Sequence, residues 1–207
     1  MKKNTTVIKL AQTALLAALC FVSFMYLKIP IPVPGGATAL HIGNAFCVLG
    51  ALLLGGVYGG MAGSIGMTLA DLLDPAYISS APKTFILKFC IGLITGLIAH
   101  KIGKINEHED KKYVLKWTIL ASIGGLGFNV IFDPLVGYVY KKYILGINAE
   151  AASILTKWSS AATFINAIVS IILVAIIYLA LRPALKKAGL FPNKIIIKEG
   201  RKQFPSV

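Results

Sequence analysis

Two pairs of polar side chains interrupt the apolar segments of this 207-residue chain at helical spacing. Asn129 and Asp133 are four residues apart, and Asp71 and Asp74 are three apart. Residues at these spacings share one face of an α-helix, so each pair would form a polar stripe. Carboxylates and amides arranged in this way can accept or donate hydrogen bonds to a small polar ligand.

Two lysines offer a competing explanation for the carboxylates. A charged side chain inside an apolar segment needs an ionic partner, a water-filled cavity or a ligand. Lys83 and Lys88 begin the next apolar segment and could neutralise either acidic pair, which would give internal salt bridges that fix helix packing. For any single residue of this group, a structural role and ligand contact are equally open.

The elements that must position these groups are membrane helices. The chain is 57% hydrophobic and 14% charged, whereas about a quarter of the residues in a soluble domain are charged. The apolar runs follow one another with short polar breaks, which predicts an all-α integral membrane protein that forms a single domain over residues 1–207. We predict a bundle of six transmembrane helices at about 7–26, 42–57, 61–73, 84–102, 113–138 and 161–181.

The connections between these spans have distinct compositions. Pro30, Pro32 and Pro34 predict that residues 28–39 form a loop or a short flap. The glycine cluster GGVYGGMAG predicts a tight reversal between the second and third spans. The stretch INAEAASILTKWSS predicts a short surface helix before the sixth span.

The net charge of +13 is a topology signal, because the basic residues lie at the margins of apolar segments and not along one polar face. Nucleic acid is therefore not an expected partner. With the amino terminus inside, 15 of the 21 Lys and Arg residues, Lys2 and Lys3 included, fall on the cytoplasmic side. Both termini are predicted to be cytoplasmic, in a prokaryotic plasma membrane.

This topology brings polar and aromatic side chains from five segments to one depth near the outer surface. There they would line a cavity under the proline-rich loop, suited to a small polar ligand. A histidine at a helix start often has a capping or interfacial role, so His41 alone is weak evidence. The residues at this depth are His41, Asn44, Asp71, Asp74, Tyr77, Lys83, Lys88, Asp133, Tyr138 and Trp158, with Asn129 and Asn166 about a turn deeper.

Small residues form a stripe on the first segment. Ala11, Ala14 and Ala18 recur at three- and four-residue spacing, which permits close packing of another helix and predicts a partner interface, although alanines are common in any packed membrane helix. Gly92 and Gly96 make a similar stripe that we expect inside the bundle. The chain has no GxxxxGK[ST] phosphate loop, so ATP coupling would have to come from partners. No metal site or cofactor is expected.

The order of several motifs resembles the S components of energy-coupling factor (ECF) transporters, closest to the riboflavin, pyridoxine and hydroxymethylpyrimidine subgroup. The motifs are ALLAAL, KIPIPVPGG, HIGNAFCVLGALLLGGVYGGMAGSIGMTLADLL and SAPKTFILKFCIGLITG, and the resemblance covers about residues 9–103. It implies six helices, a vitamin site near the extracellular side, and association with a transmembrane coupling subunit and two ATP-binding subunits. Such proteins are thought to topple in the membrane to release the vitamin inside.

The resemblance also implies roles for particular residues. The small-residue stripe for the coupling subunit maps onto Ala14 and Ala18, the gating loop onto residues 28–39, and ligand-facing positions onto His41, Asn44 and Asp71.

A flat heterocycle would suit the aromatic side chains Tyr77, Tyr138 and Trp158, and the polar groups Asn129, Asp133 and Asn166 could read its hydroxyls or ring nitrogens. We therefore expect a pyridoxine-like or hydroxymethylpyrimidine-like vitamin first and riboflavin second, with a queuosine-like base still open.

Two other classes of protein remain possible on the sequence. An ion-coupled secondary transporter would use Asp71, Asp74 or Asp133 as its coupling carboxylate. A small membrane enzyme would convert its ligand instead of carrying it.

Overall fold

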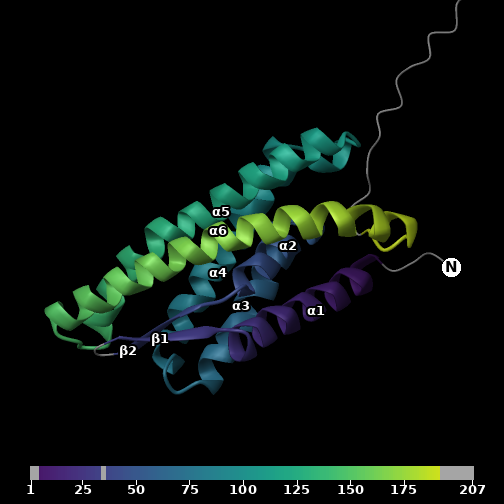
Figure 1. Cartoon of the computed structure of the whole chain (residues 1–207). Coiled ribbons are helices and arrows are strands. Elements are labelled where there is room, and N and C mark those ends of the chain that lie inside the picture. The colour runs from purple at the N-terminus through teal and green to yellow at the C-terminus, as the bar shows by residue number, and fades with distance from the viewer. Residues whose placement is uncertain (1–4, 34–35, 192–207) are drawn as a thin grey trace, which may run out of the picture.

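The protein is a bundle of long helices with one β-hairpin near one end, as seen in a computed structural model that describes residues 5–33 and 36–191 (Figure 1). The main elements are α1 (Thr5–Tyr26), β1 (Ile29–Val33), β2 (Gly36–Leu40), α2 (Gly43–Leu54), α3 (Gly56–Leu73), α4 (Ala81–Gly96), α5 (Lys111–Val139) and α6 (Ala149–Lys187). Short helical turns complete the connections: η1 (Ile78–Ser80), η2 (Leu97–Ile102), η3 (Ile105–Glu107) and η4 (Tyr140–Ile144).

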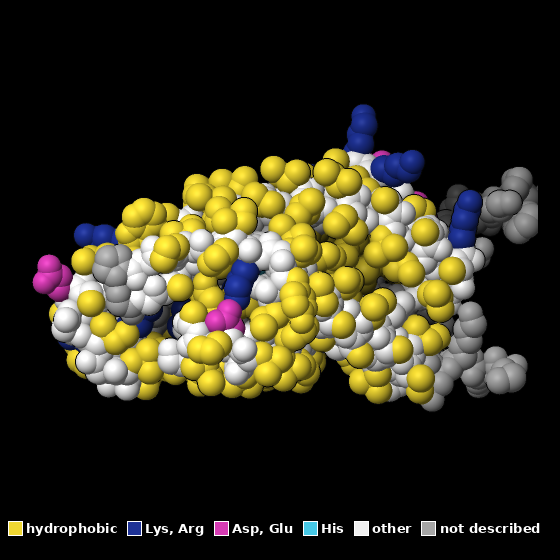
Figure 2. All heavy atoms as spheres, turned by 60° about the horizontal axis from the view of Figure 1, so that its bottom comes forward, with side chains coloured by type: hydrophobic (Ala, Val, Ile, Leu, Met, Phe, Trp, Pro, Cys, Tyr) yellow, Lys and Arg dark blue, Asp and Glu magenta, His cyan; other side chains and the backbone are white. Residues whose placement is uncertain are grey.

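Within the described residues, four stretches are long and apolar enough to cross a membrane: Thr6–Tyr26, Ile78–Ile102, Lys111–Ile144 and Ala149–Lys187. Figure 2 shows one face of the molecule, covered largely by hydrophobic side chains. The prediction of a predominantly helical membrane protein is confirmed at this level, with the hairpin as an exception to all-α.

Helix α2 is too short for a full span and is buried by the other helices. Its 12 residues cover roughly 18 Å, against a hydrocarbon core of about 30 Å. All of them except Phe46 are buried. Helix α2 therefore contributes the centre of the bundle and little of its lipid-facing surface.

The glycine cluster lies inside α3, so the predicted reversal is much shorter than expected. The turn is confined to Gly55, whose φ of 96° suits glycine. The glycines that follow let α3 approach its neighbours closely: a Cβ at Gly66 would lie 2.1 Å from the carbonyl oxygen of Ala17. Gly92 packs against Gly60 of α3, and Gly96 packs against Gly56, which confirms that their stripe is internal.

The prediction of a separate surface helix before the sixth span is wrong, because α6 is continuous over 39 residues. The side chain of Asn148 caps its start by accepting a hydrogen bond from the Ala151 N–H at 2.8 Å. No glycine or proline follows until Pro183, so nothing in this stretch interrupts the helix.

The proline-rich segment is an antiparallel hairpin and not an irregular loop. Ile29 pairs with Leu40, and Ile31 pairs with Thr38. Pro30 and Pro32 are two residues apart, so the positions without an N–H face the same edge of β1, where strands tolerate proline. Residues 34–35, including Pro34 of the predicted loop, lie outside the described residues.

The start of α1 and the end of α6 lie at the same end of the bundle, away from the hairpin (Figure 1). Gln12 Nε2 of α1 donates to the carbonyl oxygen of Leu190, just beyond α6, at 3.0 Å. Residues 1–4, with Lys2 and Lys3, and residues 192–207 lie outside the described residues. The start of α1 and the end of α6 on one side fit the predicted topology, and the cytoplasmic assignment of the termini remains a prediction.

Candidate functional site

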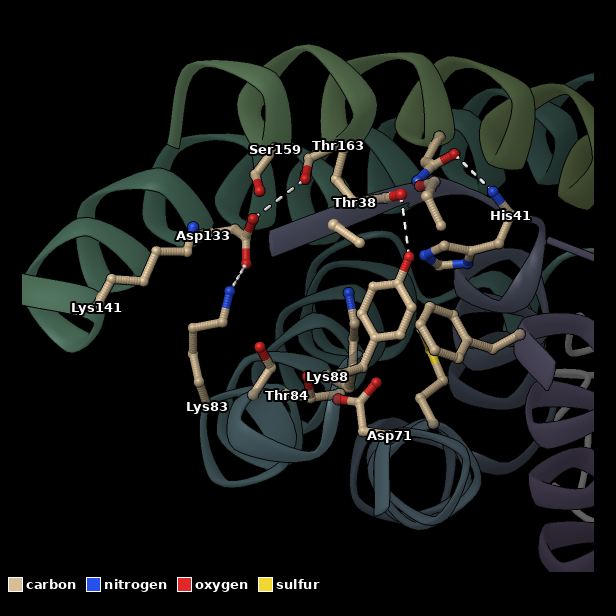
Figure 3. A pocket seen from close by; sticks show the side chains of 17 residues that line it. Thr38, His41, Asp71, Lys83, Thr84, Lys88, Asp133, Lys141, Ser159 and Thr163 are labelled. Carbon is tan, nitrogen blue, oxygen red and sulfur yellow. Dashed lines mark hydrogen bonds and ion pairs between the residues drawn. The ribbon is translucent and has the colours of Figure 1, made fainter. Parts of the chain in front are cut away.

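A polar cavity of about 100 Å³ lies between the hairpin and the adjoining ends of α3, α4, α5 and α6 (Figure 3). Seven of the twelve side chains predicted from the sequence line it: His41, Asp71, Tyr77, Lys83, Lys88, Asp133 and Asn166. The structure thus brings together groups that are up to 125 residues apart in the chain. Ligand contact by each of them remains a prediction.

The other five predicted residues do not line the cavity. Asn44 and Asn129 are both 1% exposed and lie within the bundle. Trp158 is 52% exposed on the outer surface of α6, and the Tyr138 ring lies 5.8 Å from the Lys142 amine. Asp74 forms an ion pair with Lys28.

Sequence reasoning missed ten lining residues: Phe24, Ala37, Thr38, Ala39, Met67, Ser80, Thr84, Lys141, Ser159 and Thr163. A signal existed for some of them. Ser159 and Thr163 precede Asn166 by seven and three residues, and Thr84 precedes Lys88 by four, so each hydroxyl shares a helix face with a predicted residue. Residues of the hairpin carried no comparable signal.

A buried ion pair connects three helices along one wall of the cavity. Lys83 Nζ of α4 lies 2.7 Å from Asp133 Oδ1 of α5, and the two side chains are 12% and 13% exposed. Thr163 Oγ1 of α6 donates to Asp133 Oδ2 at 3.2 Å. Both oxygens of Asp133 are therefore engaged, as a buried carboxylate requires.

The hairpin is fastened over the cavity by side chains from α6 and from the α3–α4 connection. Asn166 Oδ1 accepts from the His41 N–H at 2.9 Å, and Asn166 Nδ2 donates to the Ala39 carbonyl at 3.0 Å. The Tyr77 hydroxyl donates to the Thr38 carbonyl at 3.0 Å (Figure 3). Because these bonds hold the backbone on both sides of β2, the cavity is closed on the hairpin side.

Three rings form an aromatic wall. The Phe24 ring meets His41 and Tyr77 edge to face, at centroid distances of 4.9 Å and 5.3 Å. Nδ1 of His41 accepts a hydrogen bond from the Gly43 N–H at 3.2 Å, so the proton of the neutral ring is on Nε2. This wall offers apolar surface and one ring N–H donor to an occupant.

Asp74 belongs to a separate ion pair beside the cavity. Its carboxylate is bound by Lys28, whose amine also lies over the rings of Phe24 and Tyr77 at 4.8 Å and 4.6 Å. The hydrogen bond from Lys28 holds the pKa of Asp74 below the usual range of a carboxyl group. This pair joins the start of the hairpin to the end of α3.

Among the described residues, two buried charged groups of the cavity lack such partners, as does Lys141 at its margin. Lys88 is 8% exposed, and its amine forms no hydrogen bond or ion pair with another described residue. Asp71 is 3% exposed, and its Oδ2 atom has no hydrogen-bond partner. In the described part of the chain, no group of three His, Cys, Asp or Glu side chains could hold a metal ion.

A second hollow, of about 590 Å³, lies on the outside of the bundle between α1 and α3, and we call it the α1–α3 groove. Ala14 and Ala18 line it, together with Gly66 and Leu69 of α3, whereas Ala11 does not. Its walls are almost entirely apolar, since Thr13 is the only lining residue with a polar side chain.

Comparison with protein families decides what kind of membrane protein this is. The family described as "ECF-type riboflavin transporter, S component" matches residues 4–183. The chain belongs to this family. The resemblance seen in the sequence is thereby confirmed, and it extends to α5 and α6 as well. Membership of this family identifies the chain as a membrane-embedded subunit of a transporter and not as an enzyme.

Two related sequences are similar to large parts of the chain. The S component is 32% identical over 124 residues to an uncharacterized protein of Pyrococcus woesei, covering 60% of this chain and 71% of the relative. It is 29% identical over 155 residues to a UPF0397 protein of Exiguobacterium sp., covering 72% and 82%.

Two solved structures share the fold. ThiT from Listeria monocytogenes is 21% identical with a TM-score of 0.66, over 88% of this chain and 98% of that one. The S component for biotin from an ECF-type ABC transporter is 20% identical with a TM-score of 0.58, over 88% and 95%. At these identities the likeness concerns the fold alone.

Proposed function

We propose that this S component binds a small water-soluble vitamin in the cavity and takes part in its uptake. The observation that carries the proposal is the convergence of seven ionisable or polar side chains, predicted from sequence, on one cavity beneath the hairpin. Preorganised polar groups with apolar walls favour tight binding of a small molecule, because little ordering remains to be done when it binds.

The vitamin is a pyridine or pyrimidine heterocycle of the pyridoxine or hydroxymethylpyrimidine kind, with riboflavin as the second candidate. The size of the cavity supports this order. A cavity of about 150 Å³ accepts a benzene ring in a protein core, so about 100 Å³ requires slight expansion for one ring and far more for the three rings of a flavin. Phe24 and Tyr77 supply the apolar surface for a flat ring.

The whole chain acts as one membrane domain of six helices, of which the short α2 does not cross the membrane fully, with both termini in the cytoplasm of a prokaryotic cell. In this orientation the cavity lies near the outer surface of the membrane, beneath the hairpin. A transmembrane coupling subunit docks on the α1–α3 groove, where small side chains permit close helix packing. Two ATP-binding subunits supply the ATP hydrolysis, since this chain has no phosphate loop and no cofactor of its own is expected.

A stand-alone ion-coupled transporter is the alternative, and Asp71 is the observation in its favour. Asp133 and Asp74 are each bound by a lysine, whereas Asp71 is buried with one free oxygen, as a coupling carboxylate would be. The two functions differ in their need for partners.

Uptake of labelled vitamin separates them. The S component is reconstituted in liposomes alone or with a coupling subunit and ATP-binding subunits, and accumulation of pyridoxine, hydroxymethylpyrimidine and riboflavin is measured. We expect accumulation only with the partners and ATP. Accumulation by the S component alone, driven by an ion gradient, would establish the alternative, and recovery of a chemically altered ligand would indicate an enzyme.

A further inference from the structure

Positively charged side chains outnumber negatively charged ones in the cavity. Three lysines, Lys83, Lys88 and Lys141, line it together with two carboxylates, Asp71 and Asp133. Lys83 and Asp133 neutralise each other in their ion pair. Asp71 remains against the other two lysines, so the cavity retains one positive charge in excess.

Lys88 is the buried member of this surplus. Its side chain comes from α4, and its amine points into the middle of the cavity in Figure 3. The residue is 92% buried, yet neither Asp71 nor Asp133 lies close enough to form an ion pair with its amine. The two carboxylates attract the amine only over a longer distance. A buried ammonium group without an acceptor is costly, and the cost is removed when a ligand supplies a negatively charged oxygen.

Asp71 is the second unpaired charged group inside the cavity. Its Oδ2 atom is buried and unpaired, so it can accept a hydrogen bond from a donor on the ligand. His41 adds no charge, because its Nδ1 atom accepts a backbone N–H and the ring is therefore neutral. A ligand with one anionic hydrogen-bond acceptor and one hydrogen-bond donor would therefore satisfy both unpaired groups, Lys88 and Asp71.

We propose that the natural ligand of the cavity is a small monoanion: a single-ring heterocycle that bears one oxyanionic group of carboxylate size, bound by Lys88, and a hydrogen-bond donor, bound by Asp71. This inference rests on the proposed function and changes one part of it: the favoured ligand is an anionic single-ring relative of the pyridoxine-like and hydroxymethylpyrimidine-like vitamins named there. Lys141, half-buried at the cavity margin, provides the remaining positive field that favours an anion over the neutral form of the same ring.

The test compares pairs of related ligands in which one member bears an oxyanionic group and the other does not. Calorimetry with the full chain in detergent measures binding of pyridine-3-carboxylate against pyridine-3-carboxamide, pyridoxine against its 4-carboxylate, and riboflavin against its phosphate. We expect a single-ring carboxylate to bind at least ten-fold more tightly than its neutral counterpart. In Lys88→Met this preference should fall below two-fold, whereas Lys157→Met, which removes an exposed lysine outside the cavity, should keep it.

Thermal unfolding without ligand gives an independent readout. Lys88→Met should unfold at the same temperature as the unaltered protein or higher, because an unpaired buried amine has been replaced by an apolar side chain. Equal or tighter binding of the neutral ring, persistence of the preference in Lys88→Met, or a lower unfolding temperature would overturn the inference while leaving vitamin binding intact. Failure of every ring to bind, in either charge state, would overturn the proposed function as well.

Discussion

At the scale of single residues, the pair of Lys83 and Asp133 connects helices, and we predict that it also contributes to ligand binding; the two roles can be separated. Asp133→Asn leaves a buried lysine unpaired, so we expect destabilisation of about 3–5 kcal/mol and loss of ligand binding. The double variant Lys83→Met with Asp133→Leu should recover the unfolding temperature but not binding. Recovery of binding along with stability would contradict a ligand role for this pair; Glu150→Gln, exposed at the start of α6, serves as the control.

The ion pair between Lys28 and Asp74 predicts a specific dependence on pH. The pKa of Asp74 is lowered in the folded protein, so the contribution of this pair is complete above the ordinary carboxyl pKa of about 3.9 and is lost as the pH falls through the lowered value. The difference in unfolding temperature between the unaltered protein and Asp74→Asn should stay constant from pH 8 to pH 5 and disappear well below pH 4. A difference that changes between pH 8 and pH 5 would show that the stability contributed by this ion pair depends on the titration of another group.

How well the sequence predicted each residue depends on its chemistry. Asp71, Asp133, Lys83 and Lys88 were identified because a charge inside an apolar segment has few explanations. Hydroxyls such as Thr163 were missed, since serine and threonine are common in membrane helices and often bond within their own turn, as Ser160 does to the Thr156 carbonyl.

Three further predicted residues do not line the cavity. Asn44 and Asn129 are buried within the bundle, and Trp158 is exposed on the outer surface. The rotation of a helix about its axis depends on packing against its neighbours, which the hydrophobic pattern of one nearly uniform apolar segment does not specify.

At the scale of elements, the helices were predictable from long apolar runs, whereas the connections were not. The proline-rich segment is a hairpin because its prolines occupy only the outer edge of β1, an arrangement that proline content alone does not distinguish from a loop. Helix α6 extends through a polar stretch because Asn148 caps it further back than its apolar run begins. The cavity depends on both features, and its hairpin wall could not be deduced from the sequence.

The hydrogen bonds that hold the hairpin over the cavity predict an effect on the rate of ligand dissociation. Asn166→Ala removes two hydrogen bonds that hold the hairpin, each with a net value of about 1 kcal/mol, so we expect dissociation to become roughly ten-fold faster or more. Stopped-flow dissociation and hydrogen exchange of residues 36–41 would measure this change. Ser160→Ala, whose hydroxyl bonds only within α6 and lies outside the cavity, should change neither quantity; equal dissociation rates in all three proteins would mean that the hairpin is not the gate.

At the scale of the whole molecule, the cavity and the α1–α3 groove are separate, so binding and transport should respond to different changes. Ala14→Leu with Ala18→Leu fills the groove without touching the cavity. We expect vitamin binding within two-fold of the unaltered protein and loss of most uptake in the reconstituted complex. Ala161→Leu, at an exposed position of α6, should retain uptake, and normal uptake by the groove variant would place the coupling subunit elsewhere.

The central claim is that this S component holds an intact vitamin in its cavity, and native mass spectrometry tests it most directly. The protein is purified in detergent from cells grown in rich medium, and any co-purifying small molecule is released and identified. We predict one unchanged vitamin per chain, absent from Asp133→Ala and present in Glu150→Gln. A folded protein that carries no small molecule, and binds none after incubation with a panel of vitamins, would contradict the account.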